Sequence, residues 1–181
     1  MKPGAFLDRD GVINASVIKE GLPFPPKSLS EVKILPGVKE SIELLKSNGY
    51  VPIVVTNQPD IARGSTSPAK ITEINDYISK STGISHFYIC PHDDTDDCSC
   101  RKPKPGLIWN AVEELKIDIS KSFLVGDRWR DIEAGNIVGM DTYFVDYSYD
   151  EKQPNFPYKR VSSLQEVVNL RLGVERGPST Q

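Results

Sequence analysis

Short apolar runs alternate with amphipathic segments along most of the chain. Continuous apolar or β-branched runs, typical of strands buried on both faces, occupy residues 5–8, 51–56, 86–90, 122–127 and 141–146. Between them, apolar residues recur at helical spacing in residues 36–49, 67–83, 104–118 and 130–139. Strands that alternate with helices predict an α/β fold, in which a parallel sheet lies between two layers of helices.

Two internal stretches do not follow this alternation. Residues 14–30 contain Pro23, Pro25 and Pro26, and residues 91–105 are polar and contain cysteine and proline, so both are predicted to be loops. The segments between the strands are filled by core helices, which leaves no room for a folded cap domain. We expect residues 1–172 to form a single domain and residues 173–181 to be a flexible tail.

Composition narrows the class of protein. The chain has 181 residues and a formal net charge of −3, which argues against nonspecific binding of nucleic acid. It contains no run of about 18 apolar residues, so no membrane span is expected. The first eleven residues become charged too early for a signal peptide. We therefore expect a cytoplasmic, monomeric protein.

Asp8 and Asp10 follow the first predicted strand. Alternate residues of an extended chain point to the same side, so both carboxylates can face one site. A hard cation such as Mg²⁺ relieves the repulsion between two such carboxylates, and a carboxylate can also attack phosphorus as a nucleophile. The alternative is an ordinary solvated turn, since Asp and Gly are common turn residues.

Polar groups also follow three later elements. Thr56 and Asn57 end the second strand and offer neutral donors to a phosphoryl oxygen, although such residues often simply begin a loop. Asp127 ends the fourth strand and Asp131 follows one helical turn later, as in many capped helices. A proline-stiffened basic segment precedes the third helix, where the alternative is a solvated turn, and its cations are Arg101, Lys102 and Lys104. Ligands bind at the carboxyl ends of parallel strands, so we expect these groups to meet.

Four motifs in this order, FLDRDGVIN, TNQ, RKPKPG and GDRWRDIEAG, resemble those of the haloacid dehalogenase-like (HAD) phosphatase superfamily over residues 5–146. More narrowly, FLDRDGVIN with CPH and CSCRKPKPG is similar to the D-glycero-D-manno-heptose 1,7-bisphosphate 7-phosphatases and the related histidinol-phosphatase branch. The resemblance implies a three-layer Rossmann-like core and an aspartyl-phosphate intermediate. It also implies release of the 7-phosphate of the heptose bisphosphate in lipopolysaccharide or cell-envelope heptose synthesis.

The resemblance also implies residue roles. Asp8 is expected to be the nucleophile, and Asp10 is expected to protonate the leaving sugar oxygen and then activate water. Mg²⁺ is expected to bind Asp8, the backbone carbonyl of Asp10, and Asp127. Thr56 and Lys102 are expected to hold the transferring phosphoryl group, and the family pattern selects Lys102 over Lys104. The expected substrate-binding residues are Asn57, Gln58, Arg101 and Arg128.

The three cysteines of the chain fall within eleven residues. With one histidine they form a Cys90-x-His92-x5-Cys98-x-Cys100 pattern, which is a complete tetrahedral zinc set, although free thiols are the simpler alternative. In the resembled family this loop, here residues 90–102, binds a structural Zn²⁺. Four aspartates in the same loop are predicted to be solvated charges and not zinc ligands: Asp93, Asp94, Asp96 and Asp97.

Two departures from the family leave the substrate open. The phosphatases usually read TNQSGIARG, whereas this chain has Pro59 and Asp60 at the fourth and fifth positions, and its 14–30 loop also differs. A small phosphorylated sugar is the expected partner, and histidinol phosphate or another small phosphate monoester is the alternative. Two further alternatives are not enzymes: a catalytically silent binding protein with the HAD fold, and a zinc-binding interaction module.

Overall fold

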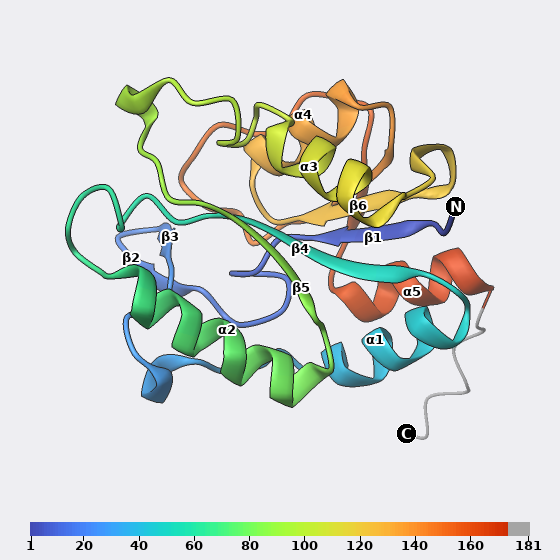
Figure 1. The fold of residues 1–181 in the computed structure, drawn as a ribbon, viewed down its shortest axis with the longest axis horizontal. Coiled ribbons are helices and arrows are strands. Elements are labelled where there is room, and N and C mark those ends of the chain that lie inside the picture. Colours follow the sequence, from blue (N-terminus) through green and yellow to red (C-terminus); the bar gives the residue numbers. More distant parts are fainter. Residues whose placement is uncertain (174–181) are drawn as a thin grey trace.

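The computed structural model describes residues 1–173, and its centre is a parallel sheet (Figure 1). The strand order is β5-β4-β1-β6-β7-β8, and every neighbouring pair is parallel. The strands are β1 (Gly4–Leu7), β4 (Val51–Asn57), β5 (His86–Cys90), β6 (Phe123–Gly126), β7 (Asp141–Val145) and β8 (Lys159–Val161). The α/β fold predicted from the alternating pattern is therefore confirmed.

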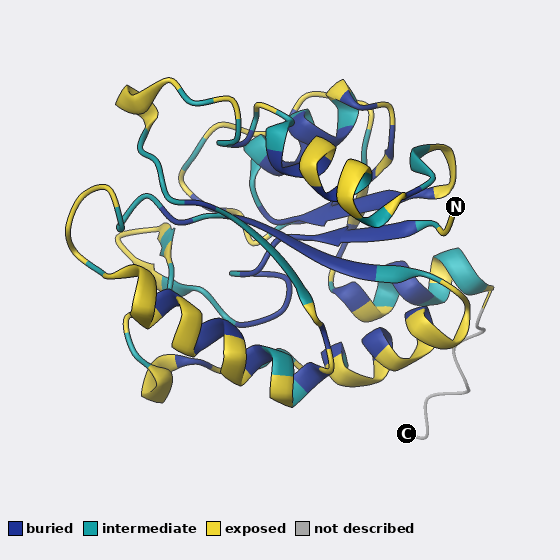
Figure 2. Cartoon of the chain, in the orientation of Figure 1, coloured by how far each residue is buried: buried dark blue, intermediate teal, exposed yellow. Residues whose placement is uncertain are grey.

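Helices cover both faces of the sheet (Figure 1). One apolar cluster joins the first face to α1 (Val38–Ser47), α2 (Pro68–Thr82) and α5 (Leu164–Leu172). A second cluster joins the other face to α3 (Gly106–Leu115) and α4 (Trp129–Ile137). Every residue of β1 and β6 is buried, as Figure 2 shows for the centre of the sheet. Because both faces are covered, these strands are continuously apolar and not alternating.

The prediction of a loop over residues 14–30 was wrong in part. This segment contains an antiparallel hairpin of β2 (Val17–Lys19) and β3 (Leu22–Phe24). The two turn residues, Glu20 and Gly21, have φ angles of 50° and 76°, which is the left-handed geometry that suits the twist of a two-residue hairpin. The prolines favoured a loop, but a strand as short as β3 tolerates Pro23.

The strand β8 and the helix α5 had no counterpart among the predicted elements. The other connections are short, and within residues 1–173 they add only the 3-10 turns η1 (Leu29–Glu31), η2 (Asp94–Asp96) and η3 (Ile119–Lys121). In the described part of the chain, no helix combines the length and the apolar content needed to cross a membrane. The predicted flexible tail lies, apart from Gly173, outside the described residues.

The close packing of α4 on the sheet predicts that a methyl group added to Gly135 lowers the stability of the protein. A Cβ atom added at Gly135 would lie 2.5 Å from Cγ2 of Thr142 on β7. We expect Gly135→Ala to lower the free energy of unfolding in urea by about 1–3 kcal/mol, because the helix or the strand must move.

Adding Thr142→Ser removes Cγ2 and keeps the hydroxyl, so the double variant should regain part of this loss. The exposed substitution Glu73→Ala on α2 is the control. Equal stability of Gly135→Ala and wild type would contradict the packing described for α4.

Candidate active site

A cavity of about 250 Å³ opens at the carboxyl ends of the strands. Leu7 of β1 pairs with Val54 of β4 on one side and with Val125 of β6 on the other, so the residues after them lie next to one another. The buried polar residues that line the cavity are Asp8, Thr56, Lys102, Asp127 and Asp131. Lining residues from surrounding loops include Phe24 of the hairpin and Pro59, Asp60, Arg63, Arg101 and Arg128.

The ammonium group of Lys102 joins two of the buried carboxylates of this site. Lys102 is 2% exposed, and its Nζ lies 2.7 Å from Asp8 Oδ1 and 2.6 Å from Asp131 Oδ1. Nζ also donates to the carbonyl oxygen of Val55 at 2.6 Å. Burial alone would lower the pKa of Lys102, but the two carboxylates outweigh it and raise that pKa. A fixed positive charge therefore lies beside Asp8.

Three carboxylates share this buried space. Asp8, Asp127 and Asp131 each offer an oxygen, and these oxygens lie within 4.8 Å of one another. Burial, although opposed by Lys102, raises the pKa of Asp8 to about 7, and burial with the nearby Asp8 and Asp131 also raises the pKa of Asp127. Among the described residues, Oδ1 of Asp127 is buried without a hydrogen-bond partner. A divalent cation bound by these oxygens would offset the crowding of the carboxylates and give Oδ1 of Asp127 a partner.

The carboxylate of Asp10 is not part of this group, because other residues hold it. Buried Arg9 donates through Nε to Oδ1 at 3.2 Å and through Nη2 to Oδ2 at 2.9 Å. Asn14 Nδ2 and Gln58 Nε2 add bonds of 2.9 and 3.0 Å. Arg9 also donates to Asn75 of α2 at 3.1 Å. Sequence reasoning missed Arg9, because arginine is rarely buried and its position between two aspartates carries no pattern of its own.

The two amide side chains at the end of β4, Asn57 and Gln58, have protein partners. Asn57 accepts from the backbone N–H of Lys102 at 3.1 Å and donates to its carbonyl oxygen at 3.0 Å. Gln58 donates to Thr56 Oγ1 at 3.0 Å as well as to Asp10. The structure thus brings these residues to the site, where Asn57 holds the backbone that carries Lys102.

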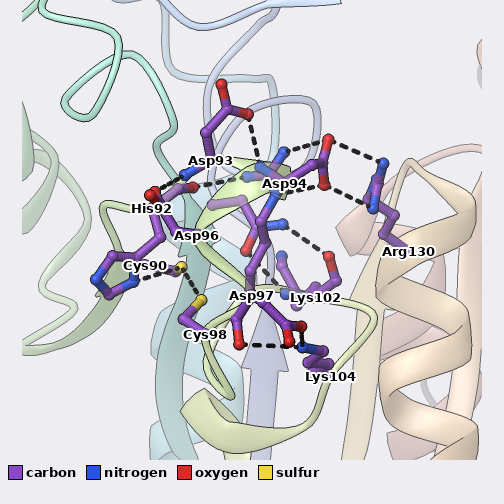
Figure 3. Close-up of polar contacts among 12 residues, drawn as sticks. Cys90, His92, Asp93, Asp94, Asp96, Asp97, Cys98, Lys102, Lys104 and Arg130 are labelled. Carbon is purple, nitrogen blue, oxygen red and sulfur yellow. Dashed lines mark hydrogen bonds and ion pairs between the residues drawn. The ribbon is translucent and has the colours of Figure 1, made fainter.

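Three thiols and one imidazole converge at the end of β5. Figure 3 labels Cys90, Cys98 and His92 of this group. The Sγ atom of Cys100 lies 3.2 Å from that of Cys90 and 3.5 Å from that of Cys98, and the Cys90 to Cys98 separation is 3.7 Å. His92 Nδ1 lies 3.6 Å from Cys90 Sγ and 3.3 Å from Cys100 Sγ. Ligands of a tetrahedral zinc ion are separated by about 3.6–3.8 Å, so the group has the size of a zinc site.

One thiol of this group is poised to ionise. Burial is the largest effect on Cys98 and opposes ionisation, but hydrogen bonds from the backbone of Arg101 and from Cys100 outweigh it and lower the pKa of Cys98 to about 7. Zinc binds the thiolate form of cysteine, so a lowered thiol pKa favours metal binding.

Asp94, Asp96 and Asp97 are exposed, as predicted, but aspartates of this loop also form ion pairs, which the prediction did not include (Figure 3). Asp93 accepts two bonds from Arg63, at 2.6 and 2.7 Å, and these bonds hold its pKa at about 2. Asp94 lies 2.8 Å from Arg101 and 3.3 Å from Arg130. None of the four aspartates belongs to the Cys/His group found among the described residues. Asp93 thus connects the cysteine loop to the loop after β4, and Asp94 connects it to α4.

The chain was also compared with known proteins. A family model for haloacid dehalogenase-like hydrolases matches residues 26–139. The chain belongs to this family. The match begins after the first motif, so it covers the elements from α1 to α4 and not the loop that carries Asp8 and Asp10.

Relatives in the family carry a common name. A D-glycero-beta-D-manno-heptose-1,7-bisphosphate 7-phosphatase of Pasteurella multocida is 32% identical over 93% of this chain and 97% of its own length. Proteins of the same name from Haemophilus influenzae and Escherichia coli are 36% and 31% identical over 75% and 77% of this chain, and 76% of each relative is covered.

The solved structure of another heptose bisphosphate phosphatase has a similar fold. The D,D-heptose 1,7-bisphosphate phosphatase from B. bronchiseptica, in complex with magnesium and phosphate, superposes with a TM-score of 0.83 at 26% identity. The superposition covers 94% of this chain and 98% of the other. The predicted membership of the HAD superfamily is thus confirmed.

The Lys102 contacts predict a stability effect. Lys102→Met should lower the free energy of unfolding by about 3–5 kcal/mol in magnesium-free buffer, because it leaves Asp8 and Asp131 buried without their cation.

Adding Asp131→Asn should recover part of that loss, which urea denaturation of the two variants measures. Lys104→Met removes an exposed lysine from the same basic segment and serves as the control. A Lys102→Met protein as stable as this control would contradict the assigned ion pairs.

Proposed function

We propose that this protein is a Mg²⁺-dependent phosphatase that hydrolyses the 7-phosphate of D-glycero-D-manno-heptose 1,7-bisphosphate. The observation that carries the proposal is the buried contact of Lys102 with Asp8 and Asp131, beside Asp127 and at the edge of the cavity. Phosphoryl transfer requires a nucleophile, a cation site and fixed positive charge, and this group offers all three. The names of the relatives support the choice of substrate.

In this proposal Asp8 attacks phosphorus and forms an aspartyl-phosphate, while the bond from phosphorus to the sugar oxygen breaks. Asp10 gives a proton to that oxygen, and it then takes a proton from the water that hydrolyses the intermediate to inorganic phosphate. The bonds from Arg9, Asn14 and Gln58 hold the Asp10 carboxylate in place for both transfers. Thr56 and Lys102 hold the transferring phosphoryl group.

Magnesium would be held by Asp8, Asp127 and the backbone carbonyl of Asp10. The unpartnered Oδ1 of Asp127 supports this ligand set. The bound ion would neutralise charge on the phosphoryl oxygens and on the crowded carboxylates. Asp131 lies in the same cluster but bonds Lys102, so its proposed role is to hold that ammonium group.

A bisphosphate carries a second phosphate that does not react. Arg101 and Arg130 line the cavity, and so does Arg63 from the loop after β4. Arg101 and Arg130 both contact Asp94, whose side chain is 54% exposed, so a phosphate can take its place at little cost. We assign substrate binding to these arginines and to Arg128.

The Cys/His group is proposed to hold one structural Zn²⁺. Cys100 directly precedes Arg101, so the metal would brace the loop that carries Arg101 and Lys102. We further propose that residues 1–172 act as one phosphatase domain and as a monomer in the cytoplasm. The three free cysteines support the compartment, because thiols persist in the reducing cytoplasm.

A substrate panel tests the proposed function. Phosphate release should show a higher kcat/KM for the heptose 1,7-bisphosphate than for histidinol phosphate or other sugar monophosphates, because a monophosphate has no second phosphate to pair with Arg101 and Arg130.

Asp8→Asn should release no phosphate from any of these substrates, and it controls for contaminating phosphatases. Preference for a different phosphate monoester would contradict the substrate, and turnover by Asp8→Asn would contradict the covalent mechanism.

Metal analysis tests the zinc site. Purified wild-type protein should contain about one zinc per chain, and His92→Ala should contain much less, because three thiols leave the tetrahedral set incomplete.

His86→Ala changes the other histidine of the chain, at the start of β5, and should retain the metal. Zinc-free wild-type protein, or equal zinc in both variants, would rule the site out.

A further inference from the structure

The segment after β7 contacts the candidate active site through alternate side chains. We call residues 147–151, with the sequence YSYDE, the strap. The Tyr147 hydroxyl donates to the carbonyl oxygen of Gly11 at 2.9 Å, and the Tyr149 hydroxyl donates to Asp127 Oδ2 at 2.7 Å. Glu151 accepts from Nε of Arg128 at 3.0 Å.

The strap also reaches the hairpin. The backbone N–H of Asp150 donates to the carbonyl oxygen of Gly21, in the turn between β2 and β3, at 3.0 Å. Tyr147 and Tyr149 stack with ring centroids 5.5 Å apart. The strap was not among the predicted site residues, because it lies outside every motif that indicated the site.

The hydrogen bond from Tyr149 distinguishes the two carboxylate oxygens of Asp127, because only one of them has a partner among residues 1–173. Oδ2 receives the phenol hydrogen, while Oδ1 is buried without a partner in the described part of the chain. Gly11 packs closely against the same carboxylate, because an added Cβ there would lie 1.9 Å from Oδ2. Tyr147 binds the carbonyl of the same glycine. The Asp127 carboxylate is therefore held in one orientation.

We propose that Tyr149 is a positioning residue that turns Oδ1 of Asp127 toward the divalent cation. The inference rests on the proposed function, because it takes Asp127 as a ligand of Mg²⁺. A phenol hydroxyl on one oxygen of a ligating carboxylate fixes the direction of the other oxygen, and it removes the rotational freedom that binding would otherwise cost. Phenylalanine preserves the ring and its stack but cannot donate this bond.

The test is the affinity of Tyr149→Phe for Mg²⁺ alone. The dissociation constant is measured on the folded, zinc-containing protein from the rise of the unfolding temperature with Mg²⁺ concentration, and again by calorimetry. We expect Tyr149→Phe to bind Mg²⁺ about tenfold more weakly than wild type.

Tyr88→Phe is the matched control, because its hydroxyl also donates to a carboxylate, Glu114, at 2.8 Å, outside the cavity lining. This control should bind Mg²⁺ as wild type does. A general loss of stability would lower the unfolding temperature without Mg²⁺ but would leave the dissociation constant unchanged.

The outcomes separate the two claims. Wild-type protein that binds no Mg²⁺ would contradict the proposed function, whereas equal affinities in wild type and Tyr149→Phe would overturn the role of Tyr149 alone. A crystal structure of the wild type with Mg²⁺ needs no variant. It should show Asp127 Oδ1 on the ion and Oδ2 on Tyr149, and the reverse arrangement would overturn the inference.

Discussion

The buried ammonium group of Lys102 is the interaction on which the arrangement of the site depends. It joins Asp8 after β1, the carbonyl oxygen of Val55 in β4, and Asp131 in α4. A buried charge is tolerated only when such partners surround it, so the three elements must keep their relative positions for Lys102 to remain buried. The same contacts leave a cation beside Asp8, where a phosphoryl group would bind. One ion-pair network thus serves both the fold and the proposed chemistry.

The loop that carries Lys102 is itself held at several points. Asn57 bonds both backbone polar groups of Lys102, and the Cys/His group lies immediately before it in the chain. Arg63 joins the loop after β4 to Asp93 with two bonds of 2.6 and 2.7 Å. Loops usually carry specificity on a rigid scaffold. Here the cysteine loop is part of that scaffold, and the hairpin and the loop after β4 line the rest of the cavity.

Much of the fold followed from local patterns. Strands β1, β4, β5, β6 and β7 were predicted because strands covered on both faces must be continuously apolar, and capped, periodic segments predicted α1 to α4. The hairpin was missed because the three prolines of residues 14–30 indicated a loop, whereas Glu20 and Gly21 form a two-residue turn in the structure. Arg9 and Tyr149 were missed for a different reason. Their roles depend on partners, Asn75 and Asp127, that lie 66 and 22 residues away.

By itself, the sequence determined the order of elements, the membership of the HAD family and the kinds of donor atom available. Hydrophobic periodicity and residue spacing are local properties of the chain, and these conclusions need nothing more. Only the tertiary structure decided that Asp8, Asp127 and Asp131 form one buried group, and that Arg9 holds the Asp10 carboxylate beside this group on the lining of the same cavity. The physical reason is that Lys102 reaches Asp8 across 94 residues. The partners of a buried charge are set by where the packed elements place them, which spacing along the chain does not encode.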